Sequence, residues 1–291
     1  TLGPEAAILL SSMSRDSTEA SAFEALISRT EDVESLVRLE ACDRETLVSN
    51  PYLHRVDRWI LGGLVADVAA GMDRSAEIAD IEARRGSMHW FGEAKVTYDA
   101  LLAASLVTAG CKEREAETGV CEDAVAALKA YSERWCQTDA AYRRYHEALR
   151  DPGLMADVDL SEVRRLVEPR YGSFLRGLAI EWQDLACKAG TWPPTGIASW
   201  QRDFYASQVA SRRDERVAVV VSDAFRYECA VELADGLRCG SPRYQASLEP
   251  AMSMLPSYTQ LGMAALLPNE CISIDPATQL VSVDGRPTVG L

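Results

Sequence analysis

Two oxygen-bearing side chains, Asp223 and Thr259, stand at positions where α/β proteins bind ligands. Asp223 follows the apolar run RVAVVV at 216–221, which is typical of a buried strand, and open α/β sheets bind ligands at the carboxyl ends of their strands. Thr259 stands in the first turn of a predicted helix over 257–267, where unpaired N–H groups and the helix dipole favour a phosphate. A divalent cation can lower the pKa of a hydroxyl and hold a phosphoryl oxygen. The pair therefore suits a metal-dependent hydrolase.

Both residues also have a purely structural interpretation. An aspartate in this place can cap the following helix through a backbone N–H, and position alone does not separate the two roles of Asp223. Capping is an alternative for Thr259 as well, but Ser257 fills that role more naturally and leaves the Thr259 hydroxyl for chemistry. A zinc site would need further Asp or His ligands. The histidines have no partner at ligand spacing and are interpreted as structural or surface residues: His54, His89 and His146.

Other catalytic classes lack their signatures in this sequence. The chain has no P-loop, no G-x-G-x-x-G and no G-x-S-x-G motif, so nucleotide-binding folds of those types and α/β-hydrolase chemistry are not indicated. A phosphoaspartyl hydrolase would carry a second aspartate two positions after Asp223, where this chain has Phe225. The aromatic residues over 131–145 and 200–205 are interpreted as helix-packing core rather than as base-stacking platforms.

The elements that must position Asp223 and Thr259 read as an α/β domain over residues 212–291. Alternation of strands and helices is the signature of a parallel sheet. Three or four strands are too few to bury both faces of such a sheet, so we predict a truncated α/β domain. The expected elements are a strand at 216–221, a helix at 226–239, a strand at 244–248, the helix at 257–267 and short strands at 271–274 and 280–283.

Residues 1–211 read as a mainly α-helical region. Apolar residues recur there at three- and four-residue spacing, and clusters of β-branched residues are absent. We expect an internal break near 151–158, followed by a helix that is interrupted at Pro169. The sequence TWPPTG at 191–196 is the clearest linker signal, and a last helix is expected over 197–209.

Composition limits the class of protein. With 291 residues, of which 47% are hydrophobic, the chain can build a sizeable core. It has no signal-peptide pattern, and no uncharged apolar run reaches the roughly 18 residues of a membrane span, so a cytoplasmic protein is predicted. The net charge of −14 disfavours a broad nucleic-acid-binding face but leaves a local basic groove open. The eight cysteines show no C-x-x-C spacing and are interpreted as reduced thiols.

Two short sequence motifs resemble those of the PglZ family of bacterial BREX phage-resistance systems. They are VVVSDAFRYE at 219–228 and LPSYTQLGMAALLP at 255–268. The resemblance implies an alkaline-phosphatase-like α/β domain, a divalent metal site with zinc, manganese or magnesium, and a metal-bound Ser or Thr that attacks phosphorus. Carried over by position, Asp223 would be a metal ligand, Thr259 both a metal ligand and the nucleophile, and the flanking Arg226 and Glu228 supporting residues. Family members usually have leucine where this chain has Phe225, an apolar exchange that leaves the implied ligands unchanged.

The resemblance also implies a role in antiviral defence. The parent protein would be a phosphatase or phosphodiesterase that acts on a phosphoester, either a nucleotide or a nucleic acid, with other BREX proteins as partners and no membrane. Because the first residue is not Met and the last ones read as the middle of a loop, we expect a fragment that lacks the superfamily's later Asp and His ligands and is inactive alone. The alternative is a non-catalytic scaffold, in which the acidic helical region docks other defence proteins.

Overall fold

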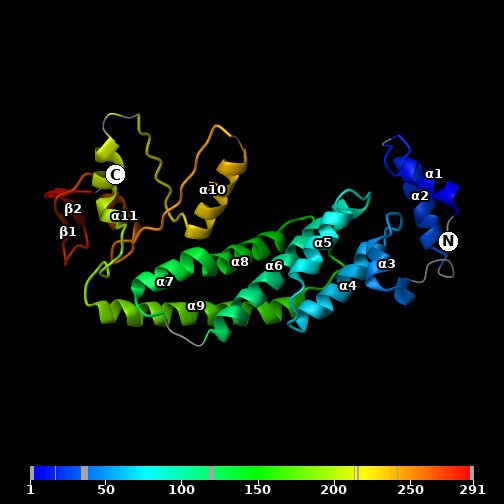
Figure 1. Ribbon diagram of the computed structural model, residues 1–291, viewed down its shortest axis with the longest axis horizontal. Helices are drawn as coiled ribbons and strands as arrows, with labels where there is room; N and C mark the ends of the chain where they lie inside the picture. The colour runs from blue at the N-terminus through cyan, green and yellow to red at the C-terminus, as the bar shows by residue number, and fades with distance from the viewer. Residues whose placement is uncertain are drawn as a thin grey trace. The chain divides into compact units, whose positions relative to one another are not determined.

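The computed structural model is mostly helical, with a small β-sheet near the C-terminus (Figure 1). Contacts divide the chain into two compact units, which we call the first and the second unit. The first comprises Thr1–Glu117 and Thr138–Leu175, and the second comprises Thr118–Gln137 and Arg176–Leu291. The predicted domain boundary between 211 and 212 stays a prediction. The structure describes residues 3–16, 18–33, 39–117, 121–212, 214, 216–240 and 242–288.

The first unit is built from amphipathic helices. On α4, the side chains of Ile60, Leu64 and Val68 are buried at four-residue spacing, which places them on one face. This face packs against α6, which also packs against α5. The mainly helical character predicted for this part is therefore confirmed. The helices are α1 (Pro4–Met13), α2 (Ala20–Glu31), α3 (Arg44–Val48), α4 (Val56–Ala69), α5 (Ser75–Arg85), α6 (Phe91–Ala116), most of α8 (Cys136–Ala148) and the first part of α9 (Ser161–Ala189), with a 3-10 turn η1 (Leu39–Ala41).

A buried arginine holds the centre of this unit together. Arg85 at the end of α5 is 1% exposed, and its Nε and Nη2 donate to the two carboxylate oxygens of Asp57 at 2.7 and 2.8 Å. The hydroxyl of Tyr98 on α6 donates to the same carboxylate at 2.9 Å. The Nη1 group of Arg85 donates to three backbone carbonyls, those of Leu47, Val48 and Asn50. Because each charge is paired and hydrogen-bonded, this network can be buried, and it joins α3, α4, α5 and α6.

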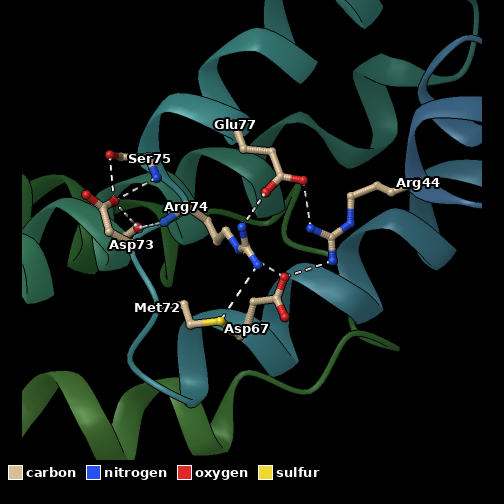
Figure 2. A network of polar contacts seen from close by, with 8 residues as sticks. Arg44, Asp67, Met72, Asp73, Arg74, Ser75 and Glu77 are labelled. Carbon is tan, nitrogen blue, oxygen red and sulfur yellow. Dashed lines mark hydrogen bonds and ion pairs between the residues drawn. The ribbon is translucent and has the colours of Figure 1, made fainter.

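Figure 2 shows a second polar network of the same unit, which is partly exposed, with Arg44 at 27% and Glu77 at 34%. Arg44 donates to Glu77 at 2.7 Å and to Asp67 at 2.9 Å. Arg74 reaches the same two carboxylates, at 3.0 Å for Asp67 and 3.3 Å for Glu77. A Cβ atom on Gly63 would lie 2.8 Å from the Arg44 guanidinium, so the glycine allows Arg44 to lie against α4. The two arginines thus cross-link α3, α4 and α5 through shared carboxylates.

The helix α9 passes through Pro169 without a break, so the interruption predicted there is wrong. Proline removes one backbone hydrogen bond from a helix and disfavours it locally. Here the neighbouring turns are held by packing, because Val167 is fully buried and Tyr171 is 5% exposed. The Tyr171 ring stacks on Tyr142 with centroids 3.6 Å apart, and its hydroxyl donates to Asp139 at 2.9 Å. Tertiary contacts with α8 therefore outweigh the local effect of the proline.

The second unit combines the rest of α9 with short elements. Its part of α9 packs Leu185 against Ala124 and Ala127 of α7. The helix predicted over 197–209 is wrong in detail, because that segment forms only short 3-10 and π turns. The helices predicted over 226–239 and 257–267 are confirmed with shifted ends. Beyond α9, the helical elements are α7 (Ala124–Ala130), the turns η2 (Tyr131–Trp135), η3 (Gln201–Asp203), η4 (Tyr205–Val209) and η5 (Ala210–Arg212), α10 (Tyr227–Gly240) and α11 (Thr259–Leu266).

The sheet of this unit is antiparallel, with the order β1 (Ile272–Ile274), β2 (Val281–Val283) and β3 (Arg286–Pro287). The register pairs Ile272 with Val283. The short strands predicted at 271–274 and 280–283 are confirmed, but the predicted parallel sheet is wrong for the described residues. A parallel pair needs a crossover of a dozen or more residues, whereas the few residues between β1 and β2 can only close a hairpin. The sheet packs on α11 through Val281 and Leu261, which are 0% and 1% exposed.

Two of the predicted strands are also wrong. Among the residues that the structure describes, 216–221 and 244–248 form no strand. The run at 216–221 is exposed throughout, with Val220 at 92%. A β-branched run favours an extended backbone, but it becomes a strand only where a neighbouring strand supplies hydrogen-bond partners, and no described segment does so here.

None of the described helices combines the length and the apolar character that crossing a membrane requires.

Candidate functional site

Asp223 lies in the turn between the extended run and α10. Its Oδ1 accepts from the backbone N–H of Ala224 at 3.0 Å, and α10 begins only at Tyr227. The carboxylate therefore does not make the hydrogen bond by which it would cap that helix. Ala224 has a φ of +54°, a left-handed conformation that is unfavourable for an alanine. This turn leaves the Asp223 side chain exposed.

Thr259 is the first residue of α11, as expected for a residue of the first turn. The residue before it, Tyr258, is the N-cap and makes no capping hydrogen bond through its side chain. The expectation that Ser257 caps this helix is wrong, because the chain enters helical geometry one residue later. The hydroxyl of Thr259 is exposed and stands at a helix N-terminus without a side-chain cap, where an anion is favoured.

The fold brings these two residues together. Although they are 36 positions apart in the sequence, the Thr259 Oγ1 lies 3.4 Å from Oδ1 and 3.5 Å from Oδ2 of Asp223. These distances exceed the usual range for a hydroxyl donating to a carboxylate. The two groups are therefore neighbours that leave space between their oxygens, rather than partners in a strong hydrogen bond.

The separation of these oxygens fits two ligands of one metal ion. Oxygen ligands of a tetrahedral zinc ion, at bond lengths of about 2.0–2.1 Å, lie about 3.3–3.4 Å from each other. The Asp223–Thr259 distance of 3.4 Å matches this value. Two ligands do not complete a site, and within the described ranges no group of three or more His, Cys, Asp or Glu side chains is placed to hold a metal ion.

Arg226 and Glu228 form an ion pair beside this turn. The Nε of Arg226 lies 2.7 Å from Oε1 of Glu228, with the arginine 56% exposed and the glutamate 1% exposed. The geometry is that of a charge contact rather than of a hydrogen bond, because neither carboxylate oxygen of Glu228 has a hydrogen-bond partner among the described residues. Glu228 lies in the first turn of α10, where the helix dipole favours a negative charge. A buried carboxylate thus restrains an exposed guanidinium that follows Asp223 closely.

The three histidines lie in the first unit, whereas Asp223 and Thr259 lie in the second. Each histidine faces a glutamate across 2.9 to 3.1 Å. The pairs are His54 with Glu93, His89 with Glu24 and His146 with Glu168.

A surface groove of about 930 Å³ lies elsewhere in the second unit, between the turns at 198–212 and the extended run at 217–220. Asp223 and Thr259 do not line it. The candidate chemistry is therefore at an open turn rather than in this groove.

Two features of this site carry no signal in the sequence. The left-handed backbone of Ala224 is one, because glycine rather than alanine marks such positions. The burial of Glu228 is the other, since glutamate in a first helical turn is ordinarily exposed and favoured there by the dipole. Burial also raises the pKa of the neighbouring Tyr227 hydroxyl above its usual value.

Comparison with known proteins decides the family. The model of the BREX system PglZ alkaline phosphatase-like domain matches residues 204–291, which include both sequence motifs noted above. Residues 204–291 belong to the PglZ family. The chain is also 30% identical over 269 residues to the alkaline phosphatase-like protein BrxZ of Escherichia coli O9:H4 (strain HS). It is 34% identical over 210 residues to the alkaline phosphatase-like protein PglZ of Bacillus cereus (strain H3081.97).

The similarity to these relatives extends beyond the PglZ domain into the helical region. The alignments cover 84% of this chain with BrxZ and 70% with PglZ, but only 30% and 24% of the relatives themselves. The chain thus spans less than a third of the length of the curated relatives it matches. No solved structure matches this chain.

Proposed function

We propose that this chain belongs to a BREX-type phage-defence protein and contributes the first part of a metal-dependent phosphoester hydrolase site. The observation that carries the proposal is the contact between Asp223 and Thr259, at 3.4 Å across 36 positions of sequence. The PglZ match supports it independently, because the matched residues include both side chains. We also propose that the complete domain has an alkaline-phosphatase-like fold.

In this proposal Asp223 and Thr259 hold a divalent cation, either zinc, manganese or magnesium. When bound, the cation would stabilise the deprotonated hydroxyl of Thr259 and polarise a phosphoryl oxygen. Thr259 is the nucleophile, and its place at the start of α11 directs backbone N–H groups towards a bound anion. Glu228 restrains the guanidinium of Arg226, which supports the site from the neighbouring helix end.

The proposed substrate is a phosphoester or phosphodiester, in a nucleotide or in a nucleic acid, and the proposed partners are other proteins of the defence system. The net charge of −14 argues that a polynucleotide would be engaged through a local contact rather than a broad basic face.

Hydrolysis of bis(p-nitrophenyl) phosphate with added zinc or manganese tests this proposal. In the complete protein that carries these residues, we expect turnover that Thr259→Ala reduces by two or more orders of magnitude. Asp223→Ala should also remove a bound metal ion, which elemental analysis measures without any assay of activity. Ser257→Ala is the matched control, because Ser257 makes no capping bond to α11 and its loss should leave turnover within about twofold. Turnover that survives Thr259→Ala would refute the nucleophile, and we expect the 291 residues alone to be inactive.

A second candidate function is a non-catalytic scaffold for the defence proteins. It is favoured because no group of three or more His, Cys, Asp or Glu side chains within the described residues is placed to hold a metal ion. For this candidate, Asp223→Ala in the complete protein would keep both phage protection and complex assembly. Loss of protection with intact assembly would favour the enzyme instead.

A further inference from the structure

One stripe of α4 is exposed although it carries a tryptophan. Arg55, Arg58, Trp59, Gly62 and Gly63 line a surface hollow of about 550 Å³. They are spaced at three, four, seven and eight residues from the first, so they occupy one face of the helix. Trp59 is 46% exposed. The other side of the same helix contributes Ile60, Leu64 and Val68 to the core of the first unit.

The two glycines of this stripe have different explanations. Gly63 lies against Arg44, because a Cβ there would come within 2.8 Å of the Arg44 guanidinium and displace it. A Cβ on Gly62 would meet nothing within 4 Å. Glycine weakens a helix interior relative to alanine, so Gly62 has a structural disadvantage that no contact in the described part of the chain explains. Its effect is to leave bare helix backbone next to the indole of Trp59.

Two exposed arginines line this hollow of an acidic protein, each with one carboxylate nearby. Arg55 and Arg58 are 50% and 55% exposed, and the described residues that line the hollow include no carboxylate, although the chain as a whole carries a charge of −14. Arg55 lies 3.9 Å from Glu31, and Arg58 lies 2.9 Å from Asp157. The second contact is solvent-exposed on both sides, and such ion pairs are readily exchanged for others. A carboxylate from outside could therefore take the place of Asp157.

We propose that this stripe, which we call the α4 docking face, binds an acidic helix of a protein partner. Tryptophan and arginine are the residues most enriched where alanine substitution weakens protein interfaces. A helix fits the face because two helices approach closely where a small residue stands at the contact, and the hollow at Gly62 accepts one apolar side chain. Arg55 and Arg58 then face carboxylates of that helix. A nucleic acid is disfavoured because the remainder of the acidic surface would repel it.

The partner is sought among the other proteins of the defence system, and in this respect the inference rests on the proposed function. Calorimetric titration of the 291-residue chain with each of these proteins should find one that binds. We expect Trp59→Ala to weaken that binding by at least tenfold and Gly62→Leu, which fills the hollow, to weaken it similarly. The double change Arg55→Gln with Arg58→Gln should weaken binding and reduce its dependence on salt.

Leu175→Ala is the control, because Leu175 is 40% exposed on α9 of the same unit and outside the α4 docking face; it should leave the dissociation constant within twofold. Circular dichroism confirms that each variant is folded. The inference is overturned when none of these proteins binds, when Trp59→Ala and Gly62→Leu bind as tightly as the unchanged chain, or when only a second copy of the chain or a nucleic acid binds. Thr259→Ala should keep this binding, so a failure of the proposed chemistry and a failure of docking give different results.

Discussion

Asp223 and Thr259 are candidate site residues because each lies at the end of a regular backbone segment. The first follows an extended run and the second begins a helix, and the structure places their oxygens 3.4 Å apart. Neither side chain makes the helix-capping bond that would account for it structurally. The chemistry proposed for them therefore depends on two local geometries, the left-handed turn at Ala224 and the uncapped start of α11.

The turn at Ala224 makes a prediction about stability. An alanine at a φ of +54° is strained by about 1 kcal/mol relative to glycine, part of which glycine loses again through its greater freedom in the unfolded chain. We expect Ala224→Gly to stabilise the second unit by about 0.5 kcal/mol. Urea unfolding followed by circular dichroism measures this change. The matched control is Ala230→Gly within α10, which should destabilise by about 1 kcal/mol because the backbone there is helical; equal effects of the two changes would contradict the assignment of the turn.

Glu82 in the first unit makes a prediction about pH. Burial, and next the negative charge of Asp99, raises the pKa of its carboxyl from 4.5 to about 7. The folded state thus binds this proton more tightly than the unfolded state does. The resulting stability is fully present below about pH 4.5 and is lost as the pH rises through 7. Allowing for partial exposure, the loss should be about 1–2 kcal/mol.

Glu82→Gln should remove that pH dependence, which unfolding in urea at pH 5 and pH 8 measures. The variant is expected to be more stable than the unchanged chain at pH 8. Glu40→Gln, a substitution at an exposed position of the same unit, is the control. It should leave the free energy of unfolding unchanged at both pH 5 and pH 8. A slope between pH 5 and pH 8 that is the same in Glu82→Gln and in the unchanged chain would contradict the prediction.

At the scale of elements, charged networks add specific cross-links to the apolar packing of the helices in the first unit. Arg85 connects α5 to Asp57 of α4, which also accepts from Tyr98 of α6, and to backbone carbonyls at the end of α3. The network of Arg44 and Arg74 repeats this pattern with partly exposed side chains (Figure 2). In the second unit the joining element is apolar, since α11 and the small sheet share the cluster around Leu261 and Val281.

The Arg85 network makes a prediction at this scale. Arg85→Met should destabilise the first unit by about 3–5 kcal/mol, because it leaves the Asp57 carboxylate, which is 2% exposed, buried without its cation. The double variant Arg85→Met with Asp57→Asn should recover a large part of that loss. Thermal unfolding of the four proteins as a double-mutant cycle measures the coupling. Additive effects of the two substitutions would show that the buried pair does not act as a unit.

At the scale of the whole molecule, the division into two units separates the candidate chemistry from the candidate docking face. Asp223 and Thr259 belong to the second unit, and Trp59 belongs to the first. The PglZ match lies within the second unit, whereas the similarity to the relatives covers 84% and 70% of the chain. At least part of the helical region is therefore similar to BrxZ and PglZ.

This division makes a prediction about metal binding. A cation that binds the folded site stabilises it by mass action, by about 2.7 kcal/mol at a concentration one hundred times its dissociation constant. When zinc is added to the complete protein, amide hydrogen exchange should slow in α10 and α11 and stay unchanged in α4 and α5. Asp223→Ala should abolish the effect. Slower exchange in both units, or in the Asp223→Ala variant, would indicate that zinc binds elsewhere.

Local patterns in the sequence are sufficient to predict most of the helices, β1 and β2, and to single out Asp223 and Thr259 as candidates. Helical periodicity, hairpin strands and family motifs all depend on residues close together in the chain, so they can be predicted from the sequence without a structure. The extended run at 216–221 shows the limit, because a β-branched segment becomes a strand only when another segment pairs with it. Pro169 shows the same limit in the other direction, since packing of Val167 and Tyr171 keeps α9 continuous. The tertiary structure alone decided the distance between Asp223 and Thr259, the burial of Glu228 and the exposure of Trp59, because each depends on contacts between residues that are distant in sequence.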